Sequence, residues 1–291
     1  MVECIPNFSE GRNAGVISAI VHAIKDTPGV LLLGWESDAD HNRSVVTFAG
    51  AAETVMEAAV RGVGKAAESI DLSEHEGVHP RTGAADVIPF APLDGSSLEE
   101  CIRVAHQAGE QIWDRFGIPV YFYEAAALTP GRQRLEKVRR KEFDGMPPDV
   151  GAAASHPTAG ACVIGAREFL IAYNALLDTP DVAVAQAIAK KIRESSGGFR
   201  HVKSIGLYLE SQGRTQVSMN LTKFAETPLD QVYECIEAEA KRLGARVENC
   251  ELIGFIPRRA FQLWPAFFQR ASNFDSSRVI ENRVDRLLHS A

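Results

Sequence analysis

The chain has 291 residues, of which 45% are hydrophobic and 24% charged, and its formal net charge at pH 7 is −7. This composition is typical of a globular protein with room for two domains, and it excludes the disordered and fibrous classes. The negative charge also argues against nucleic acid as the main partner, because phosphate binding needs a basic face. An anionic ligand would have to be held by local cations.

The five cysteines are scattered without a C-x-x-C pair, so neither a zinc site nor a disulfide framework is indicated. The first residues, "MVECIPNFSEGRN", lack the basic and then apolar pattern of a secretory signal. No apolar run approaches the roughly 18 residues that a membrane helix needs. We therefore expect a cytoplasmic protein that does not bind membranes.

Hydrophobic periodicity predicts a first unit in the order strand, helix, strand, strand, helix, strand. Its elements are expected at residues 2–6, 13–26, 30–37, 43–50, 52–70 and 85–93. A proline in the last strand favours an edge or a bulge. An added helix, a strand and a basic helix follow, at 96–116, 120–126 and 132–143. The Gly-, Ala- and Pro-rich segment 146–161 looks too long for a connector.

The same order of elements reappears in the second half of the chain. Its elements are expected at residues 169–177, 181–194, 201–210, 215–223, 229–243 and 246–256. Two units of βαββαβ order predict an α/β (α+β) fold of two ferredoxin-like subdomains, each with helices on one face of its sheet. If the other two faces lie opposite each other, they enclose a cleft of the kind that small molecules prefer.

The first polar cluster lies in "EHEGVHPRTGAADV", between a predicted helix and a predicted strand. Its two histidines have the i, i+4 spacing of a helical metal pair, but Gly77 and Pro80 interrupt the helix. We therefore expect no metal here. The candidate residues of this cluster are His75, Glu76, His79, Arg81 and Asp86.

The second polar cluster lies in "WESDADHNRSVVTF", where two strands meet. Acidic residues in turns often only solvate the chain or form Asx turns, and Asp40 has that simpler interpretation. Arg43 precedes an apolar strand and would point a permanently charged fork into the cleft, although display on the surface is the alternative. The polar residues of this cluster are Glu36, Asp38, Asp40, His41, Asn42 and Arg43.

The third cluster is the loop "GAAASHPTAGA". Small residues let backbone approach a ligand closely, while His156 and Thr158 would supply hydrogen bonds. A flexible linker between domains is the competing interpretation. Upstream, the basic run "GRQRLEKVRRKEF" would attract an anionic tail, but a solvated helix face is its default interpretation.

At these three clusters the sequence resembles the formiminotransferase domain family, folate enzymes of histidine degradation. The resemblance begins at "VECIPNFSEGRN" and continues through "HNRSVVTF", "HEGVHPRTGAADVIPF", "PVYFYEAA", "SHPTAGA", "GAREFLIAYNALL" and "QVSMNLTKF". It extends from Val2 to about Pro257. From Arg258 onward the sequence matches little of the family, and we expect no cyclodeaminase domain fused to this chain.

The resemblance implies two subdomains, at residues 1–167 and 168–291, whose sheets face each other across a substrate tunnel. It implies transfer of the formimino group from N-formimino-L-glutamate to N5 of tetrahydrofolate, giving 5-formiminotetrahydrofolate and L-glutamate. Tetrahydrofolate would be the co-substrate, with no metal, and a homodimer is the default for such enzymes. Two alternatives stay open: an enzyme that acts on 5-formyltetrahydrofolate, and a folate-binding protein without catalysis.

The resemblance also implies roles for individual residues. In the family the histidine of the "HPR" motif is the proposed acid/base, which falls on His79, and an imidazole suits proton transfer near neutral pH. The folate-binding stretch falls on 151–160, including Gly151, Ser155, His156, Pro157, Thr158 and Gly160. Because the donor's carboxylates need cationic forks, Arg43 and Arg81 are the leading candidates, with Asn42 as a polar helper. The full substrate-binding set predicted is Glu36, Asp38, His41, Asn42, Arg43 and Arg81.

Overall fold

The computed structural model describes residues 1–76, 81–93, 95–141 and 146–289. The chain divides into two compact units, Met1–Glu168 and Phe169–Ala291. Among the helices described, none has both the length and the apolar character that crossing a bilayer requires.

The sheet of the first unit contains the predicted ferredoxin-like order, with additions. Its strands are β1 (Val2–Cys4), β2 (Asn7–Phe8), β3 (Leu31–Asp38), β4 (Arg43–Gly50), β5 (Ala85–Pro92), β6 (Val120–Glu124) and β7 (Cys162–Ala166). β3 pairs with β4, and β1 and β2 lie between β4 and β5, all antiparallel. β7 and β6 then extend the sheet in parallel beyond β5. Neither β2 nor β7 was predicted as a separate strand.

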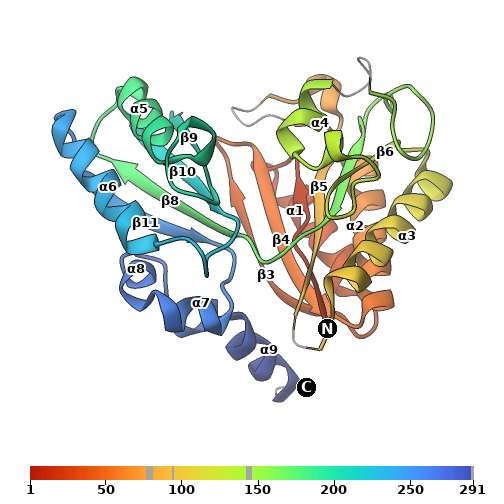
Figure 1. Ribbon diagram of the computed structural model, residues 1–291. Coiled ribbons are helices and arrows are strands. Elements are labelled where there is room, and N and C mark those ends of the chain that lie inside the picture. Colours follow the sequence, from red (N-terminus) through yellow and green to blue (C-terminus); the bar gives the residue numbers. More distant parts are fainter. Residues whose placement is uncertain (77–80, 94, 142–145, 290–291) are drawn as a thin grey trace. The chain divides into compact units, whose positions relative to one another are not determined.

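Three helices cover one face of this sheet: α1 (Ala14–Lys25), α2 (Ala52–Ser69) and α3 (Leu98–Phe116) (Figure 1). Asn13 starts α1, because its side-chain oxygen accepts hydrogen bonds from two backbone N–H groups of the first turn. Gly117, in the left-handed conformation, ends α3. The large buried side chains on this face of the sheet are Phe8, Phe48, Ile88 and Phe90.

The opposite face of the first sheet is built from the alternate residues of the same strands. There α4 (Leu135–Lys141) packs Leu135 and Val138 against Tyr121, Tyr123 and their neighbours on β5 and β7. Two short 3-10 turns, Leu72–Glu74 and Pro130–Arg132, complete the unit. The basic helix predicted at 132–143 therefore begins later, and it is not wholly solvated.

A β-bulge at Asp86 alters the alternation of β5. Phe8 is opposite Ala85, whereas the preceding residue Asn7 is opposite Val87, so Asp86 is the extra residue. Ala85 belongs to the core under the helices, while Val87 belongs to the core under α4. Bulges redirect side chains near functional sites. Here the bulge directs the Asp86 carboxylate to the face opposite the three helices.

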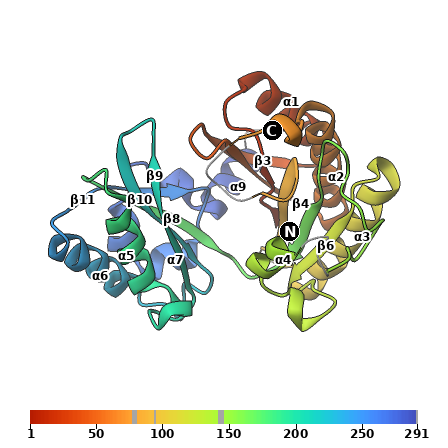
Figure 2. The same cartoon turned by 90° about the horizontal axis from the view of Figure 1, so that it is seen from above.

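The second unit repeats the ferredoxin-like order with a four-stranded antiparallel sheet. Its strands, β8 (Ile171–Leu177), β9 (Val202–Leu209), β10 (Arg214–Leu221) and β11 (Val247–Ile253), lie in the order β11-β8-β10-β9. The helices α5 (Val182–Ile192) and α6 (Leu229–Arg242) cover one face (Figure 2). Asp181 caps α5 by accepting from Ala183 N at 2.9 Å. The predicted repeat of two such units is confirmed.

The C-terminal segment belongs to the second unit. It forms α7 (Arg258–Leu263), α8 (Pro265–Gln269), the 3-10 turn Ser276–Arg278 and α9 (Ile280–His289). The hydroxyl of buried Tyr173 donates to Phe267 O at 3.1 Å, and Ile256 bridges to Val279. This segment therefore completes the core of its own unit. No helices had been predicted for this segment.

Candidate functional site

The β3–β4 turn gathers the second polar cluster at one end of the first sheet. Asp38 is opposite Arg43 in the strand register, and its Oδ1 accepts from His41 N at 2.8 Å. Asp38 thus closes the turn in the manner of an Asx turn. Asn42 adopts a positive φ of 46°, a conformation that asparagine tolerates better than most residues.

Asn42 connects this turn with two other segments. Its Oδ1 accepts from Gly11 N at 2.9 Å, and its Nδ2 donates to Glu76 O at 2.7 Å. The residue is only 3% exposed, so each bond is shielded from water. Gly11 is required because a Cβ there would lie 2.1 Å from Asp38 O.

The described residues on either side of 77–80 both contact this turn. Glu76 O accepts from Asn42, and Arg81 Nη2 donates to His41 O at 3.3 Å. The predicted acid/base His79 lies outside the described residues. Glu76 and Arg81, the described residues nearest to it in the sequence, both bond to the turn formed by the second cluster.

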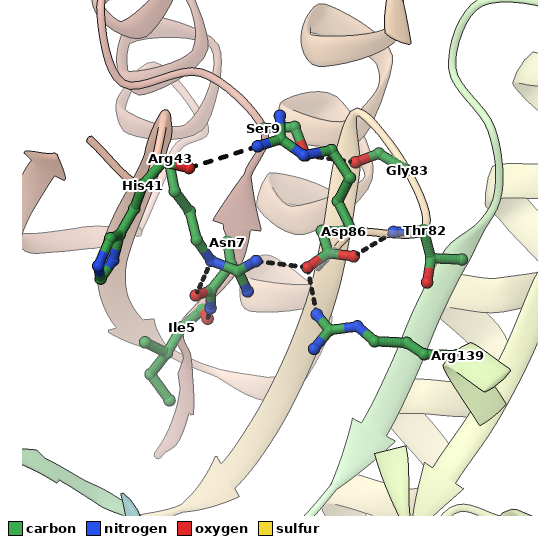
Figure 3. Close-up of polar contacts among 10 residues, drawn as sticks. Ile5, Asn7, Ser9, His41, Arg43, Thr82, Gly83, Asp86 and Arg139 are labelled. Atoms are coloured by element: carbon green, nitrogen blue, oxygen red, sulfur yellow. Dashed lines mark hydrogen bonds and ion pairs between the residues drawn. The ribbon is translucent and has the colours of Figure 1, made fainter. Parts of the chain in front are cut away.

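The Asp86 carboxylate is the centre of a network of buried polar and charged side chains (Figure 3). Its side chain is 0% exposed, and its Oδ2 accepts from Arg43 Nη1 at 2.6 Å and from Arg139 Nη2. Its Oδ1 accepts from Thr82 N at 2.7 Å. Arg43 Nε in turn donates to Asn7 Oδ1 at 3.0 Å. Arg43 therefore lies in a buried network and not on the surface.

The two guanidinium groups keep Asp86 ionised despite its burial. Burial raises the pKa of Asp86, but the charges of Arg43 and Arg139 and the Thr82 N–H bond outweigh it, so this pKa lies below its usual value. Removing one partner from such a buried pair typically costs about 3–5 kcal/mol. The carboxylate carries one negative charge against two contacting positive charges, which leaves the group net positive.

His75 lies in the same region, just before the residues 77–80. Burial lowers the pKa of His75 from its ordinary value of 6.5, and the nearby charge of Arg81 lowers it further. Its imidazole is therefore neutral at pH 7. A neutral ring beside a cation accepts or donates a hydrogen bond without adding a further positive charge.

The third cluster packs by its backbone against Leu72, just before the first cluster, and against Thr82 and Ala84 within it. Leu72 N donates to Thr158 O at 2.9 Å, Ala84 N donates to Ala159 O at 2.9 Å, and Ala161 N donates to Thr82 O at 3.1 Å. Gly160 has a φ of +68°, and a Cβ there would lie 2.4 Å from Thr82 O. This contact is possible only without a side chain at Gly160.

His156 shapes the tight turn of this loop. Its backbone N–H and C=O both pair with Gly160, and its ring Nδ1 accepts from Ala159 N at 3.1 Å and from Thr158 N at 3.4 Å. A nitrogen that accepts carries no proton, so the neutral ring has its proton on Nε2. The loop therefore presents one imidazole N–H donor in a fixed orientation.

The remaining residues predicted for folate are arranged differently. Gly151 has a φ of +100° and lies against Trp113 of α3, on the helix-covered side. Ser155 and Pro157 are exposed. The described contacts thus join Thr158 to Leu72 and bring Gly160 against Thr82, whereas Gly151 lies against Trp113.

Comparisons with known proteins match nearly the whole chain. The N-terminal subdomain of the formiminotransferase domain matches residues 1–167, and the formiminotransferase domain matches residues 172–288. The expectation that the sequence from Arg258 onward matches little of the family is therefore wrong, because the second match continues through this segment. The chain belongs to the formiminotransferase family.

The names of similar proteins support this family membership. The chain is 43% identical to the glutamate formimidoyltransferase of Streptococcus pyogenes serotype M1 and 39% identical to that of Thermoplasma acidophilum, covering 98% of each chain in both cases. It is 42% identical to the formimidoyltransferase-cyclodeaminase of Mus musculus over 92% of this chain and 52% of that protein. The chain thus spans about half of the mouse protein's length.

Many of the residues named from the sequence lie in these hydrogen-bonded segments, and their roles stay predictions; the contacts between the segments were not predicted. The sequence interpretation had no role for three residues of the buried network. It noted Asp86 without giving it a role, and it missed Asn7 and Arg139. Asp86 was detectable as a single charge at the start of an apolar strand, whereas nothing in the sequence signals that Arg139 reaches it. Among the described residues, no group of three or more His, Cys, Asp or Glu side chains has the arrangement of a metal site.

Proposed function

We propose that this chain transfers the formimino group of N-formimino-L-glutamate to N5 of tetrahydrofolate and releases L-glutamate. The observation that carries the proposal is the near-full-length similarity to two proteins named glutamate formimidoyltransferase. Hydrogen bonds between the three polar clusters support it: Glu76 and Arg81 of the first cluster bond to the 38–43 turn, and Ala84 bonds to the loop 156–160.

The reaction requires the redistribution of protons. Folate N5 attacks the amidine carbon of the donor and forms a tetrahedral intermediate; N5 must then lose a proton, and the departing glutamate nitrogen must gain one. One group that both accepts and donates near neutral pH is sufficient. We assign this role to His79, and the neutral His75 beside Arg81 would keep the surroundings from adding further positive charge.

The donor's two carboxylates need cations that are already in position. Arg43 and Arg81 serve this purpose in the proposal, since each is anchored by a hydrogen bond and neither must be ordered upon binding. Asn42 acts mainly through the backbone of Gly11 and Glu76, so we assign it a positioning role. The bond from His41 N to Asp38 gives Asp38 a similar role.

Folate would contact the loop 156–160. Thr158 and His156 are half-buried there, and the Nε2–H of His156 is a donor suited to an acceptor on the pterin or its carboxamide. We also propose that the second unit turns the other face of its sheet toward this ligand. The facing of the two sheets across a tunnel stays a prediction, as do the homodimer and the cytoplasmic location.

The proposal is tested by glutamate release. The purified chain is incubated with N-formimino-L-glutamate, and free glutamate is measured with and without tetrahydrofolate. Release that depends on tetrahydrofolate is expected. Consumption of 5-formyltetrahydrofolate without any use of the donor would instead indicate the other folate enzyme, and binding of folinic acid without turnover of either compound would indicate a binding protein.

A further inference from the structure

We propose that Arg139 of α4 binds one carboxylate of the formiminoglutamate donor, and that Asp86 is the positioning residue that holds Arg139 beside Arg43. The inference deepens the proposed function and rests on it. It adds a residue from a helix whose basic side chains would ordinarily be interpreted as a solvated face.

Arg139 is distinguished from the other basic residues of its helix by its surroundings. Its side chain is 15% exposed and contacts the fully buried Asp86, whereas Lys137 is exposed to solvent. Leu135, one helical turn earlier and on the same side as Arg139, packs against the core under α4. The helix α4 is thus packed against the sheet, and Arg139 lies on the side of α4 that faces the sheet.

The hydrogen-bonding capacity of Arg139 is only partly used. Its Nε is buried and has no hydrogen-bond partner among the described residues, and the same is true of Arg81 Nη1. A buried donor of a charged group is costly to leave unsatisfied. Both guanidinium groups interact with Asp86, Arg139 by direct contact and Arg81 through its charge. A ligand carboxylate would supply two acceptor oxygens for such donors.

The charges of the side chains around Asp86 also favour a carboxylate ligand. Arg43 and Arg139 both contact Asp86 Oδ2, so one carboxylate faces two guanidinium groups. A bound anion would balance the remaining charge. Formiminoglutamate carries one carboxylate on the carbon next to the amidine nitrogen and a second at the end of its side chain, so a carboxylate held here would orient the amidine relative to the folate. Asp86 keeps the two like charges close together when no ligand is bound.

The first test compares two variants of one helix. Arg139→Gln removes a charge from the proposed site, and Lys137→Gln removes the same charge from the exposed side of α4. With monoglutamyl tetrahydrofolate, Arg139→Gln is expected to raise the KM for the donor roughly tenfold to a hundredfold, the range for a charge-assisted hydrogen bond. The KM for tetrahydrofolate should change little, and Lys137→Gln should behave like the wild type.

The second test separates contact with the donor from a structural role. N-formimino-L-glutamine and N-formimino-L-isoglutamine each replace one carboxylate of the donor by a neutral amide. With the wild type, one of the two analogues should have a much lower kcat/KM than the donor. Arg139→Gln should lower the kcat/KM of that analogue little further, because the variant removes an interaction that the analogue already lacks. A structural defect would instead lower kcat/KM equally for the donor and for both analogues, and that result would overturn the proposal.

The positioning role of Asp86 is tested by Asp86→Asn. If this variant folds, its KM for the donor should rise about as much as that of Arg139→Gln; an unchanged KM would contradict the role. If it does not fold, the analogue comparison on Arg139→Gln still decides whether Arg139 binds the donor. A wild type that releases no glutamate would refute the proposed function itself, whereas an active wild type with an unaffected Arg139→Gln would refute this inference alone.

Discussion

Arg43 Nη1 lies 2.6 Å from Asp86 Oδ2, and this carboxylate is completely buried. Asp86 is ionised because Arg43 and Arg139 contact it, and its pKa lies below the usual value. A carboxylate whose pKa falls on folding adds stability above its unfolded pKa, about 3.9, and loses it as the pH falls through the folded value. The pair therefore stabilises the first unit at neutral pH and ceases to do so in acid.

We predict that Asp86→Asn lowers the free energy of unfolding by about 3–5 kcal/mol at pH 7, because it leaves two arginines without their buried counter-charge. Urea denaturation measures this value. The variant should also lose less stability than the wild type when the pH falls from 7 to below about 4. Asp114→Asn, an exposed change on α3, is the control. Equal acid sensitivity in Asp86→Asn and the wild type would contradict the assignment.

Gly160→Ala should damage the loop that we assign to folate. The added Cβ would lie 2.4 Å from Thr82 O, and the φ of +68° disfavours alanine. Displacement of a group in the site by about 1 Å can lower the reaction rate about a hundredfold. We therefore expect the KM for tetrahydrofolate to rise at least tenfold. Steady-state kinetics with varied folate measures this change. Gly213→Ala is the matched control, because Gly213 has a φ of +60° with open space around it.

The neutral state of His75 depends partly on Arg81. We predict that Arg81→Gln raises the pKa of His75 toward 6.5 without reaching it, because burial, the larger cause, remains. An NMR titration of the imidazole protons measures this pKa. Arg61→Gln, a charge removal on the exposed side of α2, should leave the titration unchanged. A His75 pKa that falls or stays constant in Arg81→Gln would show that the two groups do not interact.

His79→Ala should lower kcat at least about a hundredfold, the usual contribution of a positioned acid/base. Binding of folinic acid, measured by calorimetry, should be nearly unaffected, because the backbone hydrogen bonds described for the loop 156–160 are made within the loop and with Leu72 and Ala84. Near-normal turnover in the variant would remove His79 from the catalytic role. Loss of folate binding together with turnover would indicate that the variant has lost its local fold.

The repeated order of elements was readable from the sequence because each element depends on local patterns. The helix α6 has Val232, Ile236 and Ala240 at helical spacing on its buried side, and the two-residue alternation of β10 separates its two faces. Caps such as Asn13 and Asp181 also use only neighbouring residues. Local signals of this kind predicted both ferredoxin-like units correctly.

The features that were missed depend on contacts between distant residues. β7 is a five-residue strand that gains its partners, β5 and β6, only in the folded sheet. The bulge that redirects Asp86 arises from a register shift against Asn7, which lies far away in the sequence. Arg139 was assigned to a solvated helix for the same reason. Periodicity describes which side of a helix is polar, but not which buried charge a polar side chain will meet.

The central claim is tested most directly by following the carbon that is transferred. N-formimino-L-glutamate with an isotopically labelled formimino carbon is mixed with tetrahydrofolate and the chain, and the label is located by NMR while free glutamate is quantified. We predict that the label moves to folate N5 in the same amount as glutamate appears. Label that stays on the donor, or glutamate released with the labelled carbon lost to water, would contradict the proposed transfer.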